Sequence, residues 1–359
     1  MYTNLANETA GCIKLTIGEP DLDTPDAIKQ TACQALLDGQ THYAPNQGSC
    51  ALRKAIAAHE AARCGFSFDE ENILITAGAT GALYTALLGV LRAGDEVIIP
   101  TPAFPLYETI TNIAGAKPVF LDLTKTGFQI TQAALASAIT PKTKAIILNS
   151  PNNPTGVVLN DSSMRAVKNA VLGKDIYLIC DNVYAPLCMQ PCPDLSEDVQ
   201  LKSQVLLCQS FSKPYAMTGW RVGYLAAQKD VIAGLLLLHA AQVAAIPTFL
   251  QTACITALRT DISEMREIYR RRCGYVCSRL AKMGLSFPQP DGAFYVFADI
   301  SRFGLTSDEF CTRLIRQAKV AAVPGSCFGA DGYIRISYAC SEQDLQEGLD
   351  RLENFLATL

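Results

Sequence analysis

The sequence is poor in histidine, in charge and in basic runs, and each shortage excludes a class of function. The 359 residues include only three histidines, too few to join the cysteines in a zinc site. Charged residues make up 18% of the chain and the net charge is −4, so no nucleic-acid surface is expected. The most apolar stretch, 231–250, is interrupted by His239, Gln242 and Pro247, which predicts buried helices and no membrane span.

Cysteine, in contrast, is abundant, with 14 in the chain. In a long chain of this kind they are typical of reduced thiols in a cytoplasmic or anaerobic setting and not of a disulfide framework. Cys188 and Cys192 are four residues apart, as are Cys273 and Cys277, but a metal would need further ligands nearby. No apolar run precedes the first basic residue, Lys14, so a secretory signal is not expected. We expect a cytoplasmic protein without a bound metal.

The pattern of apolar runs predicts an α/β fold. Hydrophobic residues make up 49% of the chain, enough for a large core. Continuous apolar runs, typical of strands buried on both faces, alternate with segments of helical periodicity. We expect strands near 73–76, 96–100, 118–121, 144–149, 176–180 and 206–208, and helices near 82–91, 131–139 and 161–172. This alternation predicts a mostly parallel sheet covered by helices on both faces.

The two ends of the chain differ from this middle part. A helical region is expected over 229–283, with a break at Ile246-Pro247. Shorter strands and helices are expected after residue 283, up to the C-terminus. The length allows about two domains. We therefore expect a large domain over 39–255 and a smaller α+β domain built from 1–38 and 256–359.

The loops that carry chemistry all follow predicted strands. They are 78–80, 102–107, 150–156, 181–184 and 210–213. In parallel sheets, ligands bind beyond the carboxyl ends of the strands, so these loops predict one shared site. The small-residue turn at 78–80 opens a helix, and backbone amides at a helix start attract phosphate; such residues also serve close packing of a helix on a sheet.

Lys213 lies just past a strand end, close to Ser210 and eight residues before Arg221. A lysine amine in a partly dry pocket loses proton affinity and becomes a nucleophile that can form an imine with an aldehyde. The three residues together are typical of the aldehyde and phosphate contacts of a pyridoxal phosphate enzyme. Taken alone, Lys213 would be interpreted as a surface residue in a loop, and only the rest of the chain favours the catalytic interpretation.

Three further polar residues follow neighbouring strands. Asp181 can keep a pyridine nitrogen protonated, and Tyr184 can hydrogen-bond the phenolic oxygen of the same ring. Asn153 can donate to that oxygen and so lower the pKa of the imine. The alternatives are a helix cap or surface turn for Asp181 and an ordinary Asn-Pro turn for Asn153.

Phe104 and Arg335 complete the candidate site. Phe104 offers a flat face for stacking on an aromatic cofactor, although core packing explains it equally well. Arg335 stands among apolar strand residues, where a charge is paired or functional. Its fork geometry suits a bidentate contact with a substrate carboxylate.

In order along the chain stand Gly-Glu-Pro-Asp (18–21), Asn-Pro-Thr-Gly (153–156), Asp-x-x-Tyr (181–184), Ser-x-Ser-Lys (210–213), Gly-Trp-Arg-x-Gly-Tyr (219–224) and Ile-Arg-Ile-Ser (334–337). With these motifs the chain resembles the class I and II aminotransferases of the aspartate and aromatic kind, which are fold type I pyridoxal phosphate enzymes. The resemblance spans nearly the whole chain. It implies a seven-stranded large-domain sheet and transfer of an amino group between an L-amino acid and a 2-oxo acid by a ping-pong mechanism.

The resemblance also implies roles for individual residues. Lys213, Asp181 and Tyr184 would be catalytic, and Gly18, Asn153 and Arg335 would bind the substrate. The residues implied for the cofactor, pyridoxal 5'-phosphate, are Lys213, Ala79, Thr80, Phe104, Asn153, Asp181, Val183, Tyr184, Ser210, Arg221 and Tyr43. Tyr43 would reach the phosphate of a neighbouring subunit, which implies a homodimer with shared active sites. Two departures, Phe104 in place of tryptophan and Thr80 in place of lysine, argue against a preference for acidic substrates.

Other functions remain open on the motifs alone. A carbon–sulfur β-lyase on the same scaffold would use the same lysine and ring, and the cofactor motifs do not separate the two reactions. A transcriptional regulator that reuses this domain would need a DNA-binding segment ahead of Gly18, and none is expected. A nicotinamide dehydrogenase would suit alternating strands and helices, but no Gly-x-Gly-x-x-Gly turn follows a strand.

Overall fold

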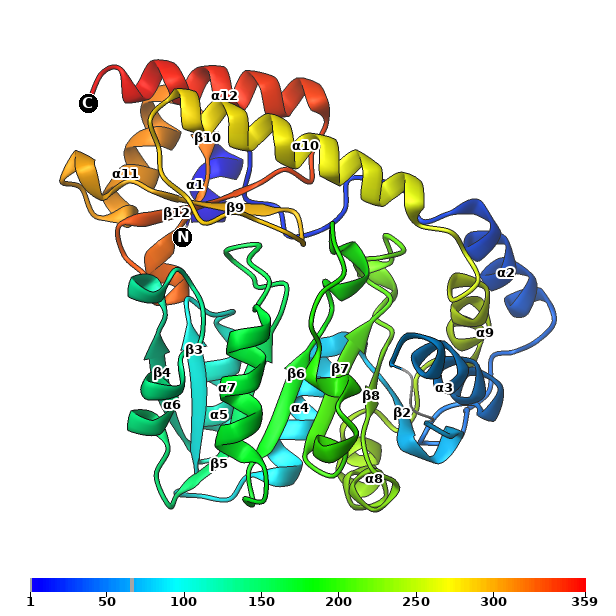
Figure 1. The fold of residues 1–359 in the computed structure, drawn as a ribbon. Coiled ribbons are helices and arrows are strands. Elements are labelled where there is room, and N and C mark those ends of the chain that lie inside the picture. Colours follow the sequence, from blue (N-terminus) through cyan, green and yellow to red (C-terminus); the bar gives the residue numbers. More distant parts are fainter. Residues whose placement is uncertain (1, 65–67) are drawn as a thin grey trace.

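The computed structural model describes residues 2–64 and 68–359, and a seven-stranded sheet forms its centre (Figure 1). The strand order is β2-β8-β7-β6-β5-β3-β4, and β8 alone runs antiparallel to its neighbours. The strands are β2 (Ile73–Thr76), β3 (Glu96–Thr101), β4 (Lys117–Asp122), β5 (Thr143–Asn149), β6 (Tyr177–Asp181), β7 (Val205–Ser210) and β8 (Gly223–Ala226). The prediction of a mostly parallel sheet of seven strands is confirmed.

Helices cover both faces of this sheet because successive side chains of each strand point to opposite faces. On β3, Ile98 packs into one core while Val97 and Ile99 pack into the other. The first core includes side chains from α2 (Asp26–Leu37), α3 (Cys50–Cys64), α6 (Gln132–Ala138), α7 (Asp161–Val171) and α9 (Thr248–Ala257). The second includes side chains from α4 (Gly78–Val90), α5 (Leu106–Ile113) and α8 (Lys229–Val243).

A smaller layer lies above the carboxyl ends of the large sheet (Figure 1). Its three-stranded antiparallel sheet has the order β11-β12-β9, and β1 pairs with β10 beside it. The elements are α1 (Tyr2–Glu8), β1 (Ile13–Lys14), α10 (Ser263–Lys282), β9 (Tyr295–Asp299), α11 (Ser307–Arg313), β10 (Val320–Ala321), β11 (Val323–Pro324), β12 (Tyr333–Ser337) and α12 (Glu342–Leu356).

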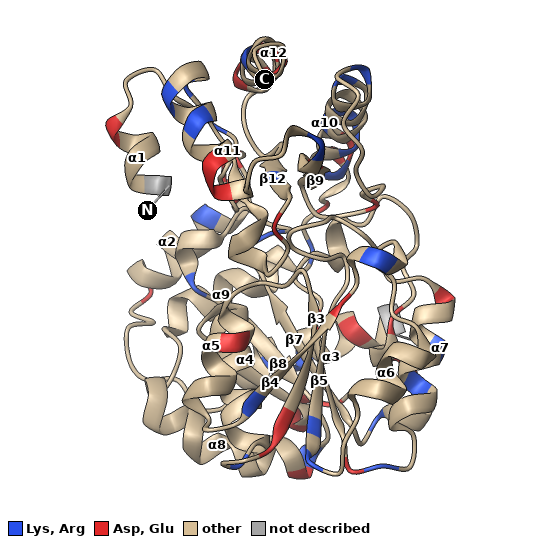
Figure 2. Ribbon diagram, turned by 90° about the vertical axis from the view of Figure 1, so that its left-hand side faces the viewer, with Lys and Arg blue, Asp and Glu red and all other residues tan. Residues whose placement is uncertain are grey.

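Ion pairs as well as apolar packing hold this layer together. Arg279 of α10 pairs with Asp350 and Glu353 of α12, and basic and acidic residues are mixed along these helices (Figure 2). The N-terminal segment reaches both layers, because β1 pairs with β10 whereas Ile28 of α2 is buried in the first core of the large sheet. The predicted domain boundaries at 38/39 and 255/256 stay a prediction.

Three local expectations need correction. Helix α4 begins at Gly78 and not at residue 82, so the small-residue turn is itself the first turn of the helix. Helix α1 was not expected, and its seven residues carry no charged residue in the first turn to signal a start. Cys188 and Cys192, expected as reduced thiols, are joined by a disulfide, because the turn between them brings their Cα atoms to 6.7 Å.

The apolar stretch at 231–250 does not form one continuous helix. It is divided between α8 and α9, and the break comes at 244–247, where Ala244 has a positive φ and Pro247 precedes α9. Within the described ranges, no helix is both long enough and apolar enough to cross a bilayer.

Candidate active site

A cavity of about 310 Å³ lies between the carboxyl ends of the large sheet and the smaller layer. Its walls come from loops after five parallel strands, from Arg221 two residues before antiparallel β8, from Gly18 of the N-terminal segment, and from β9 and β12 above. The residues predicted for the site that line it are Gly18, Ala79, Thr80, Phe104, Asn153, Asp181, Val183, Tyr184, Ser210, Lys213, Arg221 and Arg335. The fold therefore brings together residues more than 300 positions apart.

Asp181 is the last residue of β6, is 4% exposed and lines the cavity. Burial raises the pKa of Asp181 to about 6, although hydrogen bonds from Tyr107 and from the Val183 amide favour the charged form. Tyr107 Oη donates to Asp181 Oδ2 over 2.6 Å, and Asn149 Nδ2 donates to the Asp181 carbonyl. A buried carboxylate held in this way suits a cationic partner in the cavity.

Lys213 follows β7 and reaches into the same space. Its Nζ donates to the Gly18 carbonyl and lies 5.9 Å from the ring centres of Tyr184 and Phe294. Burial lowers the pKa of Lys213 to about 8, while the Glu19 carboxylate opposes that shift. Near neutral pH, more of this amine is therefore uncharged than in an exposed lysine, and the uncharged form can act as a nucleophile.

Arg335 of β12 is 7% exposed, and its guanidinium is held on several sides. Nη1 donates to Asn153 Oδ1 over 2.8 Å, and Nη2 donates to the Thr16 carbonyl over 2.8 Å. Aromatic rings lie near its carbon, Tyr295 at 4.4 Å and Phe328 at 5.0 Å. Nε is buried without a partner in the described part of the chain, whereas Nη1 and Nη2 each keep a second N–H that can donate to a ligand carboxylate in the cavity.

The opposite end of the cavity is suited to a phosphate group. Residues 78–80 form the first turn of α4, where free backbone amides and the helix dipole favour an anion. Arg221 packs so closely over Gly78 that a Cβ there would lie 2.7 Å from Arg221 Nη2. The Ser210 hydroxyl, also in the cavity, donates to Ser212 Oγ over 2.9 Å.

Tyr43 is the one predicted site residue that the cavity does not include. Its side chain is 92% exposed. Conversely, sequence reasoning missed Tyr107 and Tyr295, both of which line the cavity. Tyr107 stands three residues after Phe104 in a loop already assigned to the correct sheet edge, which was a usable signal. Tyr295 lies on a strand of the other layer, and no local pattern pointed to it.

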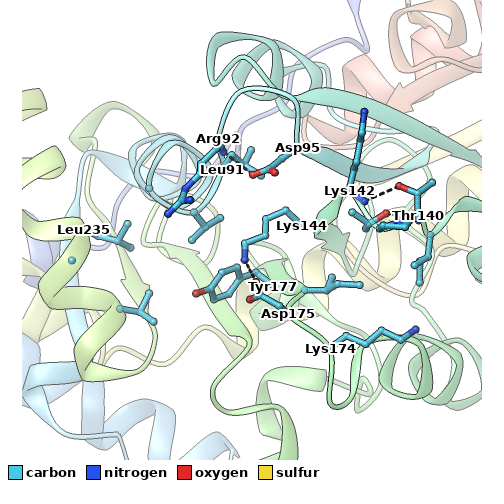
Figure 3. Close-up of a pocket in the computed structure, with 18 of the residues that line it drawn as sticks. Leu91, Arg92, Asp95, Thr140, Lys142, Lys144, Lys174, Asp175, Tyr177 and Leu235 are labelled. Atoms are coloured by element: carbon cyan, nitrogen blue, oxygen red, sulfur yellow. Dashed lines mark hydrogen bonds and ion pairs between the residues drawn. The ribbon is translucent and has the colours of Figure 1, made fainter.

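A larger cavity, of about 1010 Å³, lies at the amino ends of β3, β5 and β6 (Figure 3). Both basic and acidic side chains line it, and Lys144 forms an ion pair with Asp175 beside the Tyr177 ring. No predicted site residue lines it. The smaller cavity at the carboxyl ends of the strands is therefore the candidate active site.

Comparison with known proteins agrees with this geometry. The family model for aminotransferase class I and II matches residues 10–352. A probable N-acetyl-LL-diaminopimelate aminotransferase from Bacillus subtilis is 40% identical, with 99% of this chain and 92% of the relative covered. An aspartate aminotransferase from Pyrococcus horikoshii is 38% identical, with 98% of this chain and 92% of the relative covered.

Solved structures give the same result. An aromatic aminotransferase from Pyrococcus horikoshii superposes with a TM-score of 0.94 at 37% identity, covering 100% of this chain and 99% of the other. The aspartate aminotransferase of Thermus thermophilus with maleate has a TM-score of 0.91 at 35% identity, covering 96% of this chain and 91% of the other. From the family match, these relatives and the fold, the chain belongs to the class I and II aminotransferases.

Proposed function

We propose that the protein uses pyridoxal 5'-phosphate to move an amino group between an L-amino acid and a 2-oxo acid by a ping-pong mechanism. The observation that carries the proposal is the convergence of Lys213, Asp181 and Arg335 on one cavity of about 310 Å³. An amine with a lowered pKa, a buried carboxylate and a guanidinium are the three groups that this chemistry requires of a protein.

The residues present fit this cofactor. The helix start at 78–80 and the Arg221 guanidinium offer donors to a phosphate. Gly78 has no Cβ, and this leaves room for the Arg221 guanidinium beside the helix start. Asp181 is buried with no cationic partner bonded to it among the described residues, so a protonated pyridine nitrogen would offset the cost of its charge. Phe104 and Val183 line the same cavity and can pack against a ring.

Each protein group then has a definite task. When bound, pyridoxal phosphate supplies an aldehyde for amine exchange and a ring that accepts the electrons of a broken bond at the substrate α-carbon. Arg335, fixed by Asn153 and Thr16, would orient the substrate through its α-carboxylate. The Lys213 amine would accept the α-proton and return it, since its pKa of about 8 suits proton transfer near neutral pH.

The remaining residues would hold the cofactor in place. Asn153 accepts from Arg335 through Oδ1, which leaves Nδ2 to donate to the phenolic oxygen. Burial raises the pKa of Tyr184 well above its usual value, so that hydroxyl stays protonated and can donate to the same oxygen. Ala79, Thr80 and Ser210 would contact the phosphate.

A homodimer with shared sites is also part of the proposal. Tyr43 carries a large aromatic side chain that is 92% exposed, as expected of a residue that reaches into a neighbouring subunit. Sedimentation equilibrium should give twice the chain mass, and Tyr43→Phe should weaken binding of pyridoxal phosphate without dissociating the dimer. The cytoplasmic location stays a prediction.

The decisive experiment supplies a panel of amino donors with 2-oxo acid acceptors and measures transfer with purified holoenzyme. Lys213→Ala should abolish turnover and change the absorbance of the bound cofactor, whereas Lys125→Ala, an exposed lysine, should change neither. Undiminished transfer by Lys213→Ala would contradict the assignment. Release of pyruvate and ammonia from cystathionine without an acceptor would identify a β-lyase instead.

A further inference from the structure

Tyr295 connects two parts of the cavity that the proposed function uses separately. It is the first residue of β9 and is 1% exposed. Its hydroxyl lies 2.9 Å from the Tyr184 hydroxyl, and its ring centre lies 4.4 Å from the guanidinium carbon of Arg335. One side chain therefore touches both the residue proposed for the cofactor's phenolic oxygen and the residue proposed for the substrate carboxylate.

The direction of the hydrogen bond between the two tyrosines follows from proton counting. A tyrosine hydroxyl has a single proton to donate. If Tyr184 donates that proton to the cofactor, it must accept from Tyr295, and the two hydroxyls form a donor chain. Hydrogen bonds in such a chain polarise one another, so Tyr295 makes Tyr184 a stronger donor.

The ring of Tyr295 acts on Arg335 in a different way. The guanidinium lies close to the rings of Tyr295 and Phe328 while its edge donates to Asn153 and Thr16. Contact between a guanidinium and an aromatic face is favourable and limits rotation of the cation. The second N–H groups of Nη1 and Nη2 are then held in one place relative to an incoming carboxylate.

The Tyr295 hydroxyl also explains the glycine at position 18. A Cβ built on Gly18 would lie 3.1 Å from Tyr295 Oη, and nothing else lies within 4 Å of it. The backbone of Gly18 is not in the left-handed region, so the restriction is steric. The Gly18 carbonyl also accepts a hydrogen bond from Lys213 Nζ. The N-terminal segment therefore contacts Lys213 at the same residue whose Cα faces the Tyr295 hydroxyl.

We propose that Tyr295 is a positioning residue, which strengthens Tyr184 as a donor to the cofactor through its hydroxyl and orients Arg335 for the substrate carboxylate through its ring. The inference rests on the proposed function, since both targets are defined by it. It assigns separate roles to two parts of one side chain, so two substitutions can test them independently.

The first test compares Tyr295→Phe with Tyr295→Leu in the substrate-free holoenzyme. Tyr295→Phe removes only the hydroxyl and should raise the pH at which the absorbance of the bound cofactor titrates by about half a unit, because a weaker donor stabilises the phenolic anion less. The same variant should bind succinate and 3-phenylpropionate, which cannot be transaminated, within about twofold of the wild type. Tyr295→Leu removes the ring and should weaken binding of these carboxylates about fivefold or more.

The second test is a double-substitution cycle with Gly18→Ala. In the wild type, the new methyl group should push the Tyr295 hydroxyl by a few tenths of an ångström, lengthen its hydrogen bond to Tyr184 and shift the cofactor titration in the same direction as Tyr295→Phe. In the Tyr295→Phe background, Gly18→Ala should cause no further shift, because the clashing oxygen is gone. Additive shifts would overturn the assignment.

Tyr333→Phe serves as the matched control, since it removes a tyrosine hydroxyl outside this cavity. It should leave the cofactor titration and carboxylate binding unchanged. A titration in Tyr295→Phe that coincides with the wild type would refute the role of the hydroxyl. If the wild type transfers amino groups with pyridoxal phosphate bound and yet this result is obtained, only the inference on Tyr295 fails; a wild type that binds no cofactor would overturn the proposed function itself.

Discussion

Replacing Asp181 with Asn in the cofactor-free protein should remove a pH-dependent loss of stability. Burial raises the pKa of this carboxyl from 3.8 to about 6 on folding. Between those values the folded protein binds more protons than the unfolded chain, so stability falls as the pH rises. Below pH 3.8 the penalty is absent, and above about pH 6 it is present in full.

The expected magnitude follows from the size of the shift. One pKa unit corresponds to about 1.4 kcal/mol, and a rise of about two units therefore costs about 3 kcal/mol of unfolding free energy above pH 6. The amide in Asp181→Asn fills the same volume and carries no charge. The variant should thus be more stable than the wild type by about 3 kcal/mol at pH 7.5, and the difference should shrink towards zero near pH 4.

Urea unfolding of both proteins, freed of cofactor, at several pH values between 4 and 8 measures this difference. Titrating groups that do not interact with Asp181 contribute equally to both proteins and cancel when the two curves are subtracted. Glu108→Gln, which neutralises an exposed carboxylate on α5, should track the wild type at every pH. Parallel stability curves for wild type and Asp181→Asn would show that burial of this carboxylate carries no cost and would refute the reasoning.

Three further predictions concern the same cavity. Arg335→Lys should weaken binding of succinate at least tenfold, because an ammonium cannot form the bidentate contact with a carboxylate. The dissociation constant of pyridoxal phosphate should change less than twofold in the same variant. Equal losses of succinate and cofactor affinity would count against the substrate role of Arg335. Tyr107→Phe removes the 2.6 Å hydrogen bond to Asp181 and should weaken pyridoxal phosphate binding about tenfold in equilibrium titrations. An unchanged affinity would show that this hydrogen bond does not hold the Asp181 carboxylate in its charged form. In cofactor-free protein, reductive methylation of Lys213 with formaldehyde should rise with pH around a midpoint of about 8, since only the neutral amine reacts; a midpoint near 10.5 would mean that the amine is not desolvated.

Most of the fold could be predicted because its signals are local. Apart from β4, which is mostly exposed or half-buried, the strands of the large sheet are short and largely buried apolar runs, and such runs predict strands. Starts and ends are less certain, as at α4, where a small-residue turn and the first turn of a helix look alike. The disulfide between Cys188 and Cys192 could not be predicted, since a spacing of four residues does not tell whether a turn brings the two together.

Some residues of the candidate site could likewise be predicted from the sequence, and others could not. Asp181 is the last residue of β6 and Lys213 stands three residues after β7, and the carboxyl ends of parallel strands meet at one edge of a sheet. Sequence order and chemistry were thus enough to nominate them, although their roles stay proposals. Tyr107 needed one further fact, namely which residue its hydroxyl touches.

Composition, apolar periodicity and the residues after each strand were sufficient to identify the fold class, the edge of the sheet that binds ligands and the groups that gather there. Contacts between segments that are distant in the sequence could not be predicted from these patterns. Tyr295 meets Tyr184 only because β9 of the smaller layer lies over the large sheet, and Arg335 meets Asn153 for the same reason. Local preferences fix where a strand ends, whereas the packing of one layer on another decides which side chains face each other across the gap.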